Sequence, residues 1–206
     1  MILETVTVGS WEVNCYILAN GNSSSAVIID PGSQEHKIRQ VLNKHKLTPG
    51  IVINTHGHAD HIGCDDRFGV PVYIHSQDAA LLTDATLNLS NFLMSPISIK
   101  SQIRAVEDKS TIRLEGIELE VLHLPGHTPG GIALRLKIPQ DNLVFTGDSL
   151  FFHSIGRTDL AGSSEQMLIK SIIDKLFILP DDTLVYPGHG PSSTIGREKR
   201  ENPFLN

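Results

Sequence analysis

The chain has 206 residues, a formal net charge of −6 at pH 7, 40% hydrophobic residues and 19% charged residues. These values are ordinary for a globular protein, and a chain of this length can bury a substantial core. The acidic balance argues against a broad nucleic-acid surface, because binding a phosphate backbone relies on clustered Lys and Arg. We therefore expect a globular protein that does not bind nucleic acid.

The sequence shows no sign of export or membrane insertion. Cys15 and Cys64 are too few for a disulfide framework. The N-terminal MILETVTVGS lacks the basic start and apolar core of a signal peptide, and no apolar run approaches the ~20 residues needed to cross a bilayer. Since no linker or charge run divides the chain, we expect one domain over residues 1–206, cytoplasmic and without a membrane partner.

The first part of the chain alternates short β-rich runs with turns. ILETVTVG, NCYILAN and AVIID predict strands, which GSW and GNSSS separate. Residues 34–47 predict a helix, because Ile38, Val41 and Leu42 fall on one face, with His45 at its edge. GIVINTH predicts a buried strand that stops at a group of histidines. PVYIH then predicts another strand, and QDAALL a short helix.

Residues 83–104 show no clean hydrophobic period. A long irregular stretch inside a compact domain often forms a substrate lid or a binding loop. A pair of short helices fits the sequence equally well, so the pattern favours neither structure.

The second part of the chain repeats the rhythm of the first. TIRL and IELEVLHL predict a hairpin around Glu115 and Gly116, and GGIALRLKI, NLVFTGD and TLVYPGHG predict strands. Two β-rich halves that each carry helices predict an α+β fold, in which two packed sheets are covered by helices on both outer faces. SEQMLIKSIIDKLFIL predicts the last long helix, whose inner face is expected to include Met167, Leu168, Ser171, Ile172, Lys175 and Leu176.

Residues 53–64 read INTHGHADHIGC and concentrate candidate metal ligands in one short segment. These are His56, His58, Asp60 and His61. A single His-x-His pair is weak by itself, because surface histidines pair by chance. HGHADH as a whole is more specific, although any motif carries a false-positive risk.

Three later segments place a candidate ligand directly after a predicted strand. LPGHTPGG carries His127, VFTGDSL carries Asp148 and VYPGHGP carries His189. Each ligand follows or precedes a glycine, which permits tight turns and close backbone approach. Side chains at the mouths of several strands can converge on one point, so we expect these three to join the cluster at 56–61. The remaining histidines are interpreted as surface or packed residues: His36, His45, His75, His123 and His153.

The candidate ligands are nitrogen and oxygen donors without a thiolate. Seven such groups are too many for one tetrahedral ion and suit two ions that share a carboxylate. The absence of a cysteine ligand argues against a closed structural zinc site. Because imidazole suits zinc and iron while carboxylate adds manganese, we expect two divalent metal ions, with zinc as the first choice and iron or manganese as alternatives.

Together, THGHADH, PGHTPGG, FTGD and PGHG resemble the metallo-β-lactamase fold superfamily, with IIDPG as its usual early segment. The resemblance extends over about residues 2–205. It implies a four-layer αβ/βα sandwich with the metal site at one edge, and it implies that Asp30 orients the ligand loops from behind. It also implies a division of the ligands: His56, His58 and His127 on one ion, Asp60, His61 and His189 on the other, and Asp148 as the bridge.

Two further segments narrow the resemblance. GRTDL, residues 156–160, resembles the segment after the bridging aspartate in glyoxalase II (hydroxyacylglutathione hydrolase) and in persulfide dioxygenase. ENPFLN, residues 201–206, resembles the NPF segment of glyoxalase II, and the match is closest to the short bacterial glyoxalase II-like hydrolases. Within GRTDL, Arg157 and Asp159 are expected to pair and brace the site; the alternative is an ordinary surface salt bridge.

The sequence departs from full-length glyoxalase II near its end. That family has a helical stretch between its last metal histidine and NPF, followed by a basic tail that grips glutathione. Here only residues 190–201 separate His189 from Asn202. The usual glutathione-binding residues therefore have no counterparts in this sequence, and Arg197, Lys199 and Arg200 are interpreted as solvated surface cations.

The resemblance and the ligand set predict a hydrolase. A divalent metal lowers the pKa of a bound water from about 15.7 towards about 7, and Asp60 is expected to orient the metal-bound hydroxide. A thioester suits this chemistry, because a thiol pKa near ~8.5 lets the leaving thiolate depart with little protonation. No G-x-S-x-G nucleophile motif is present. We therefore expect a dinuclear hydrolase of small S-acyl thioesters, such as hydroxyacylglutathione.

Other activities stay open to different degrees. Persulfide dioxygenases resemble the chain at the same motifs, yet use one iron held by two histidines and an aspartate, and they are the main alternative. The negative charge and the lack of a basic arm disfavour a phosphodiesterase or nuclease. The lack of an export signal disfavours a β-lactamase proper, and the complete ligand set disfavours a metal-binding module with an inert site.

Overall fold

The computed structural model describes residues 1–139 and 142–205.

The first half of the chain forms a six-stranded sheet. In this first sheet the strand order follows the chain, and pairing is antiparallel from β1 to β3 and parallel from β3 to β6. Its strands are β1 (Ile2–Val8), β2 (Val13–Ala19), β3 (Ser25–Ile29), β4 (Thr48–Ile53), β5 (Val72–His75) and β6 (Ile103–Val106).

The second half of the chain forms another six-stranded sheet, with one parallel pair at β10 and β13 and antiparallel pairs elsewhere. Its order is β14 (Ser193–Thr194), β13 (Leu184–Pro187), β10 (Leu143–Gly147), β9 (Ile132–Ile138), β8 (Ile117–His123) and β7 (Thr111–Leu114). The predicted hairpin is confirmed, because Leu114 pairs with Ile117 across Glu115 and Gly116. A small hairpin of β11 (Leu150–Phe151) and β12 (Ser154–Ile155) forms a separate two-stranded sheet.

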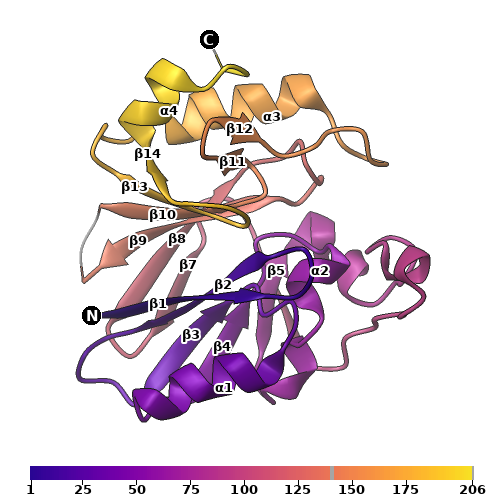
Figure 1. Ribbon diagram of the computed structural model, residues 1–206, viewed down its shortest axis with the longest axis vertical. Coiled ribbons are helices and arrows are strands. Elements are labelled where there is room, and N and C mark those ends of the chain that lie inside the picture. The colour runs from indigo at the N-terminus through magenta and orange to yellow at the C-terminus, as the bar shows by residue number, and fades with distance from the viewer. Residues whose placement is uncertain (140–141, 206) are drawn as a thin grey trace.

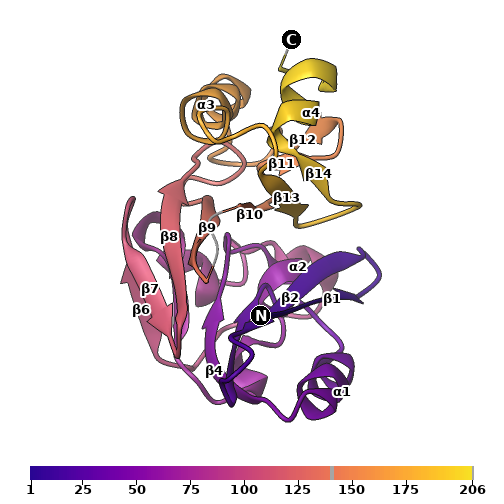
Figure 2. The same ribbon diagram turned by 90° about the vertical axis from the view of Figure 1, so that its left-hand side faces the viewer.

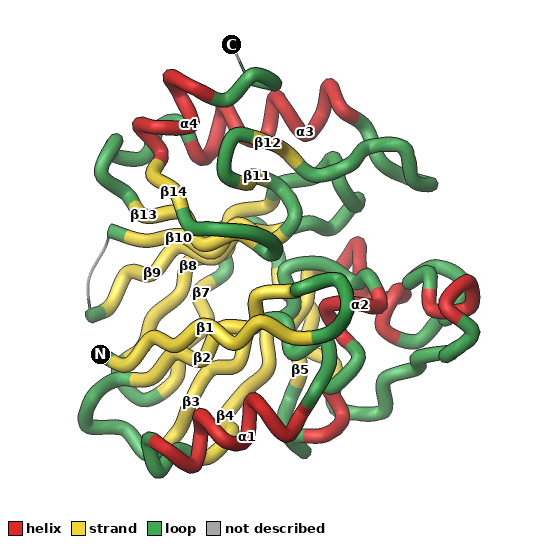
Figure 3. Tube along the Cα trace, viewed as in Figure 1, coloured by secondary structure: helices red, strands yellow, loops and turns green. Residues whose placement is uncertain are grey.

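Helices cover the outer faces of the two sheets. Figure 1 shows α1 (Glu35–Lys44) outside the first sheet, and α3 (Glu165–Ser171) and α4 (Ile195–Glu201) outside the second. Figure 2 shows the same layers after a quarter turn, and the tube in Figure 3 colours the helices red and the strands yellow. The layers run helix, sheet, sheet, helix, so the predicted four-layer αβ/βα sandwich is confirmed.

Short helical turns connect the layers. They are α2 (Ala59–Ile62) and the 3₁₀ turns η1 (Asp65–Arg67), η2 (Ser76–Leu82) and η3 (Ser90–Leu93), while η4 (Ile172–Leu176) is a π-helical continuation of α3. The turn η2 is the short helix that QDAALL predicts. Among the described residues, no helix is long and apolar enough to cross a membrane.

Three apolar layers hold the sandwich together, and side-chain alternation in the strands produces them. In β3, Ala26 and Ile28 face the layer under α1, whereas Val27 and Ile29 face the second sheet. The middle layer between the sheets contains Phe145, which is fully buried. The third layer lies between the second sheet and the helices α3, η4 and α4.

The buried face is predicted correctly for one of the two long helices and wrongly at one residue of the other. In α1, Ile38 and Leu42 are buried, and Val41 and His45 are partly buried, as the period predicts. The prediction for the last helix is wrong at Met167, whose side chain is 49% exposed. Leu168, Ser171, Ile172 and Leu176 form the buried face at spacings of three, one and four residues. Met167 lies beside the buried stripe of the helix and not within it. The stripe covers only part of the circumference of the helix, so a neighbouring residue stays exposed.

Residues 83–104 form an irregular loop rather than a helix pair. The turn η3 is its one helical part, and β6 begins at Ile103. Buried Asn88 holds the loop: its amide nitrogen donates to the carbonyls of Leu81 and Ile97 at 2.8 and 3.1 Å, and its side-chain oxygen accepts from the backbone N–H of Ser90 at 3.0 Å. These bonds replace the helical ladder that the sequence does not support.

Gly32 sets how closely the end of β3 approaches α2. A Cβ at Gly32 would lie 1.5 Å from the carbonyl oxygen of Asp60 and 3.3 Å from the Cα of His61. Substitution therefore forces α2 away from its place. By contrast, a Cβ at exposed Gly21 would come no closer than 3.6 Å to another atom.

We expect Gly32→Ala to lower the free energy of unfolding by about 1–3 kcal/mol, as for other overpacked sites. Gly21→Ala, the matched control, is expected to change it by less than about 0.5 kcal/mol. Urea unfolding followed by circular dichroism measures both. Equal stabilities of the two variants would show that α2 is not held by this close approach.

Candidate metal centre

The ends of four strands deliver the predicted ligands to one edge of the sandwich. His56 follows β4 and leads into α2, which carries Asp60 and His61. His127 follows β8, and Asp148 directly follows β10. His189 follows β13, the parallel neighbour of β10. Because parallel strands end at the same edge of a sheet, the ligands of β10 and β13 lie side by side.

The structure brings all seven predicted ligands together. Their ligating atoms form three overlapping groups, and within each group all atoms lie within 4.8 Å of one another. The groups are His56, His58 and His127; His56, His61 and Asp148; and Asp60, His61 and His189.

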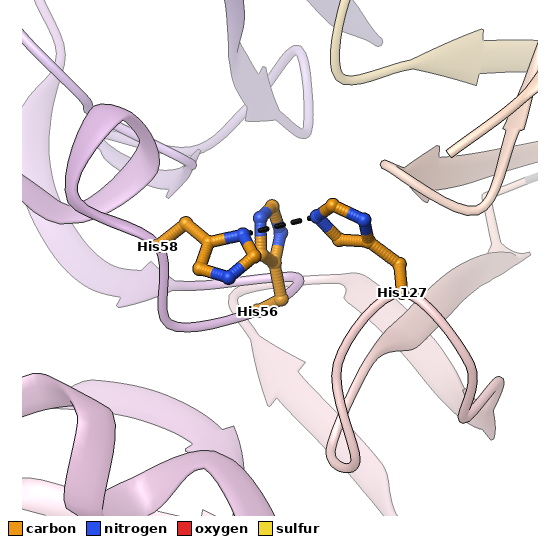
Figure 4. Close-up of side chains that lie close together, drawn as sticks. All are labelled: His56, His58 and His127. Carbon is orange, nitrogen blue, oxygen red and sulfur yellow. Dashed lines mark hydrogen bonds between the residues drawn. The ribbon is translucent and has the colours of Figure 1, made fainter. Parts of the chain in front are cut away.

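The first group consists of three buried imidazoles. Figure 4 shows His58 and His127 pointing toward each other from two separate loops, with His56 beside them. Nδ1 of His58 lies 3.0 Å from Nε2 of His127. The ring centroid of His56 lies 4.8 Å from that of either neighbour. Three imidazole nitrogens facing one point form a typical site for a transition-metal ion.

The other two groups share His61 and combine imidazoles with carboxylates. Nε2 of His189 lies 3.5 Å from an oxygen of Asp60 and 3.5 Å from an oxygen of Asp148. Nε2 of His61 lies 3.4 Å from Oδ1 of Asp148. The other oxygen of Asp148 lies 3.7 Å from Nε2 of His127, so this carboxylate also reaches the first group. Gly188 makes room for it, because a Cβ there would lie 2.2 Å from Oδ1 of Asp148.

Backbone carbonyls orient two of the rings from outside the cluster. Nδ1 of His127 donates to the carbonyl of Arg157 at 2.8 Å, and Nδ1 of His189 donates to the carbonyl of Trp11 at 2.8 Å. With a proton fixed on Nδ1, the neutral form of each ring presents Nε2 as a lone-pair donor that faces the cluster. This is the arrangement by which proteins orient metal-binding histidines.

Asp30 supports the cluster from behind, where the resemblance places it. Its carboxylate accepts from the backbone N–H of Thr55 at 2.8 Å and from the Thr55 hydroxyl at 2.7 Å. It also lies 3.0 Å from Nδ1 of His61, although the two groups are not aligned for a hydrogen bond. The contact directs Nε2 of His61 toward Asp148. The backbone of Asp30 takes a left-handed conformation with φ of 51°, which aspartate tolerates better than most residues.

The cluster fits a bound cation better than an empty polar core. Among the described residues, Nε2 of His56 and Oδ1 of Asp148 are buried without a hydrogen-bond partner, and such orphaned groups are costly unless something binds them. Burial and the neighbouring imidazoles lower the pKa of His56 well below its usual value. Burial likewise lowers the pKa of His58 to about 4. Both rings are therefore neutral at pH 7, the form that binds metal.

The carboxylate side of the cluster has the opposite electrostatics. Burial lowers the pKa of His61, but Asp148, Asp30 and Asp60 outweigh it and raise that pKa to about 9. Burial is likewise outweighed at His189, where Asp148 and Asp60 raise the pKa to about 10. Burial raises the pKa of Asp148, yet the histidines around it hold it below its usual range. This half of the cluster attracts positive charge, which either protons or a metal ion can supply.

Asp78, in η2, is a structural part of the site that the sequence reading does not identify. Its buried carboxylate accepts from the backbone N–H of Gly57 at 3.1 Å, from the Thr128 hydroxyl at 2.7 Å and from the backbone N–H of Gly130 at 2.6 Å. One residue thus ties the loop of His56 and His58 to the loop of His127. Only an acidic residue within an apolar helical run, QDAALL, could have pointed to it.

The predicted pair of Arg157 and Asp159 forms, but it lies in solvent. Two hydrogen bonds of 2.7 and 2.9 Å join the side chains, which are 57% and 69% exposed. The link from this segment to the cluster is the main-chain carbonyl of Arg157 on His127. A bracing role for the side chains stays a prediction.

The other five histidines lie outside the cluster. His75 is buried and stacks on His123 at a ring distance of 3.9 Å. His45 contacts Glu4, His153 contacts Glu201, and His36 is exposed. These contacts agree with the interpretation of packed or surface residues.

A cavity of about 780 Å³ opens onto the ligands. His58, Asp60, His127, Asp148 and His189 form its floor. Its walls come from the β1–β2 turn, the loop around η3, Phe151 of β11 and the segment after β12. The ligands are therefore reachable by a small molecule, unlike those of a closed structural site.

The chain belongs to the metallo-beta-lactamase superfamily, whose family description matches residues 8–189. This superfamily generally comprises metal-dependent hydrolases, and it binds divalent metal ions. All seven candidate ligands fall within the matched residues.

Bacterial relatives match the chain over nearly its whole length. A Mycobacterium tuberculosis protein is 43% identical over 100% of this chain and 98% of its own length. "Probable metallo-hydrolase YqgX" of Bacillus subtilis is 39% identical over 97% of this chain and 95% of its own. "Hydroxyacylglutathione hydrolase GloC" of Haemophilus influenzae is 36% identical over 100% of this chain and 99% of its own length.

Solved structures share the fold at similar identity. The chain superposes on BLEG-1, described as a B3 metallo-beta-lactamase, with a TM-score of 0.91 and 36% identity, covering 100% of both chains. TTHA1623, solved in a di-iron-bound form, superposes with a TM-score of 0.81 and 36% identity, covering 98% of this chain and 100% of that one. ETHE1 from Myxococcus xanthus superposes with a TM-score of 0.79 and 30% identity, covering 98% of this chain and 84% of that one.

We expect Asp78→Ala to destabilise the protein and to weaken metal binding together. The substitution leaves three buried donors without an acceptor, each costing about 1–3 kcal/mol. Urea unfolding and metal content after dialysis measure the two effects. Asp66→Asn is the control, because Asp66 also accepts from backbone N–H groups, those of Lys100 and Ser101, but is exposed and outside the cluster. Full metal content in Asp78→Ala would contradict a positioning role.

Metal loading should release protons at neutral pH. In the metal-free protein His61 and His189, with pKa values of about 9 and about 10, hold protons at pH 7.5. Because a ligating imidazole must lose its proton, we expect about one to two protons per chain to be released when Zn²⁺ binds. The release should vanish as pH rises above both pKa values.

A pH-indicator dye in weakly buffered solution measures this release. His189→Ala should reduce it, whereas His36→Ala, at an exposed histidine, should not. Zinc binding at pH 7.5 without proton release would show that these rings are already neutral.

Proposed function

We propose that this protein is a dinuclear metal-dependent hydrolase of S-acyl thioesters. The observation that carries the proposal is the set of overlapping ligand groups on the floor of an open cavity, with Asp148 within 3.7 Å of His61, His127 and His189. His56, His58 and His127 would hold one ion, and Asp60, His61 and His189 the other. Two divalent ions in such a site lower the pKa of water and polarise a carbonyl group.

Asp60 is suited to orient the attacking water. It lines the cavity, and its carboxylate lies 3.5 Å from Nε2 of His189 and 3.7 Å from Nε2 of His61. Burial raises the pKa of Asp60, but His61 and His189 hold it below its ordinary value. The group is therefore an anion at neutral pH and accepts a hydrogen bond from water.

The substrate supplies what the site lacks. Beyond the ligands, the described residues that line the cavity include no histidine, cysteine or lysine that could protonate a leaving group. An amine or alkoxide leaving group would need such an acid. A thiolate, with a conjugate pKa near ~8.5, leaves without one. This match favours thioesters among acyl substrates.

Relatives support the proposal. GloC, at 36% identity over the whole chain, is described as a hydroxyacylglutathione hydrolase, and YqgX as a probable metallo-hydrolase. The di-iron form of TTHA1623 supports a two-metal site and keeps iron beside zinc as a candidate metal. Manganese is the third candidate.

Two other activities have support of their own. The likeness to ETHE1 at 30% identity accompanies the resemblance to persulfide dioxygenase at GRTDL, so a mononuclear iron enzyme is the second candidate. The likeness to BLEG-1 adds β-lactam hydrolysis to the activities to be measured.

Metal analysis and a substrate panel test the proposal together. The purified protein is assayed with S-D-lactoylglutathione, other acyl thioesters, nitrocefin and glutathione persulfide, in air and without oxygen. Two metal ions per chain with oxygen-independent thioester hydrolysis are expected. One iron per chain with oxygen uptake on persulfide would establish the dioxygenase instead.

We expect Asp148→Ala to lower kcat/KM for a thioester by at least about 100-fold and to reduce the metal content per chain. The carboxylate reaches both ligand groups, so its loss weakens both. Asp174→Ala is the control, because exposed Asp174 of η4 pairs with Lys170 of α3 and lies outside the candidate ligand cluster. Unchanged hydrolysis and metal content in Asp148→Ala would refute the shared-carboxylate site.

A further inference from the structure

The walls of the metal cavity are apolar. Above the ligands, six large apolar side chains from separate parts of the chain line it: Trp11, Leu89, Phe92, Leu93, Phe151 and Leu160. We call these residues the apolar wall. Trp11 is 55% exposed and Phe92 is 76% exposed. Large exposed apolar side chains around a concave site are typical of a surface that a ligand covers.

The apolar wall is fixed in place beside the metal ligands. Asn88 holds the loop that carries Leu89, Phe92 and Leu93 through its side-chain hydrogen bonds. The carbonyl of Asn88 also accepts from the backbone N–H of Ala59 at 2.9 Å, at the start of α2 and next to Asp60. On the opposite side, the carbonyl of Trp11 accepts from His189. Backbone groups therefore connect the apolar wall to α2, which carries Asp60, and to the ring of His189.

Charge is scarce on this wall. Among the described cavity residues that are not candidate metal ligands, Arg157 is the one charged side chain. Its guanidinium already makes two hydrogen bonds to the carboxylate of Asp159. The cavity floor adds the carboxylates of Asp60 and Asp148. A glutathione arm, which carries two carboxylates and one ammonium group, would find a single cation here, and that cation is already paired.

We infer that the apolar wall binds an aliphatic or aromatic arm of the thioester, so that the enzyme prefers apolar thioesters over those of glutathione. The inference rests on the proposed function and narrows its substrate class. The apolar arm lies on either the acyl or the thiol side of the scissile bond, and the two sides share the same chemistry of recognition. Burial of each further methylene on the wall strengthens binding.

Kinetics with matched thioesters test the preference. One series carries acetyl, butyryl, hexanoyl and octanoyl groups on N-acetylcysteamine, and a second carries the same acyl groups on glutathione. A third series uses acetyl thioesters of alkanethiols, which separates the acyl side from the thiol side. We expect kcat/KM to rise about fourfold per methylene in the first or the third series. We also expect no advantage for glutathione.

A pair of variants assigns the effect to the wall. Phe92→Ala should flatten the dependence on chain length, because it removes the most exposed ring of the wall. Met94→Ala is the matched control, since Met94 is 92% exposed on the same loop and does not line the cavity. Hydrolysis that is independent of chain length, or a glutathione advantage above about tenfold, would overturn the inference and leave thioester hydrolysis intact.

Binding supplies a readout that does not depend on turnover. Trp11 is the one tryptophan of the sequence, so its fluorescence reports on the wall. S-alkyl-N-acetylcysteamine thioethers, which cannot be hydrolysed, should quench or shift it with a Kd that falls about fourfold per methylene. If no thioester is hydrolysed, the proposed function fails, and this titration alone decides the wall: a Kd independent of chain length overturns the inference, and a falling Kd upholds it.

Discussion

The structure depends on holding imidazole and carboxylate groups close together in one largely buried cluster. Nδ1 of His58 and Nε2 of His127 are 3.0 Å apart, and Asp148 touches both halves of the cluster. Without a metal ion, protons on its imidazoles have to balance the charge of the cluster, and buried atoms such as Nε2 of His56 and Oδ1 of Asp148 have no hydrogen-bond partner in the described part of the chain. The fold supplies the constraint through carbonyls and buried carboxylates that fix each ring from outside. The packed sheets are rigid enough to keep this arrangement.

Strand order explains why distant segments supply the ligands. The parallel pairs β3–β4 and β10–β13 end at the same edge, so Asp30 and His56 on one sheet meet Asp148 and His189 on the other. Asp78 adds a link across the sheets, between the loops that follow β4 and β8. The site is thus built at the seam of the two halves. Its geometry depends on how the sheets pack as well as on the loops themselves.

Much of this arrangement is predictable from the sequence, because the signals are local. Alternating strands, turn glycines and a helix period predict the sandwich, and ligands placed directly after strands predict the cluster. Asp78 is not predictable, since its partners lie in loops far away in sequence. The burial of Met167 is predicted wrongly, because the helical period shows where the apolar stripe runs but not how much of the helix surface the neighbouring sheet covers. The loop around η3 is fixed by Asn88, and no hydrophobic pattern encodes such side-chain bonds.

Trp11 serves two surfaces at once. Its carbonyl oxygen accepts the proton on Nδ1 of His189, while its indole forms part of the cavity wall. A molecule that rests on the indole and shifts this residue would therefore move the acceptor that orients the candidate ligand His189. By linkage, the free energy of occupying the wall and that of loading the ion share a coupling term, which must be equal in both directions. On the proposed function, the turn between β1 and β2 would couple the occupancy of the cavity to the affinity for the cation.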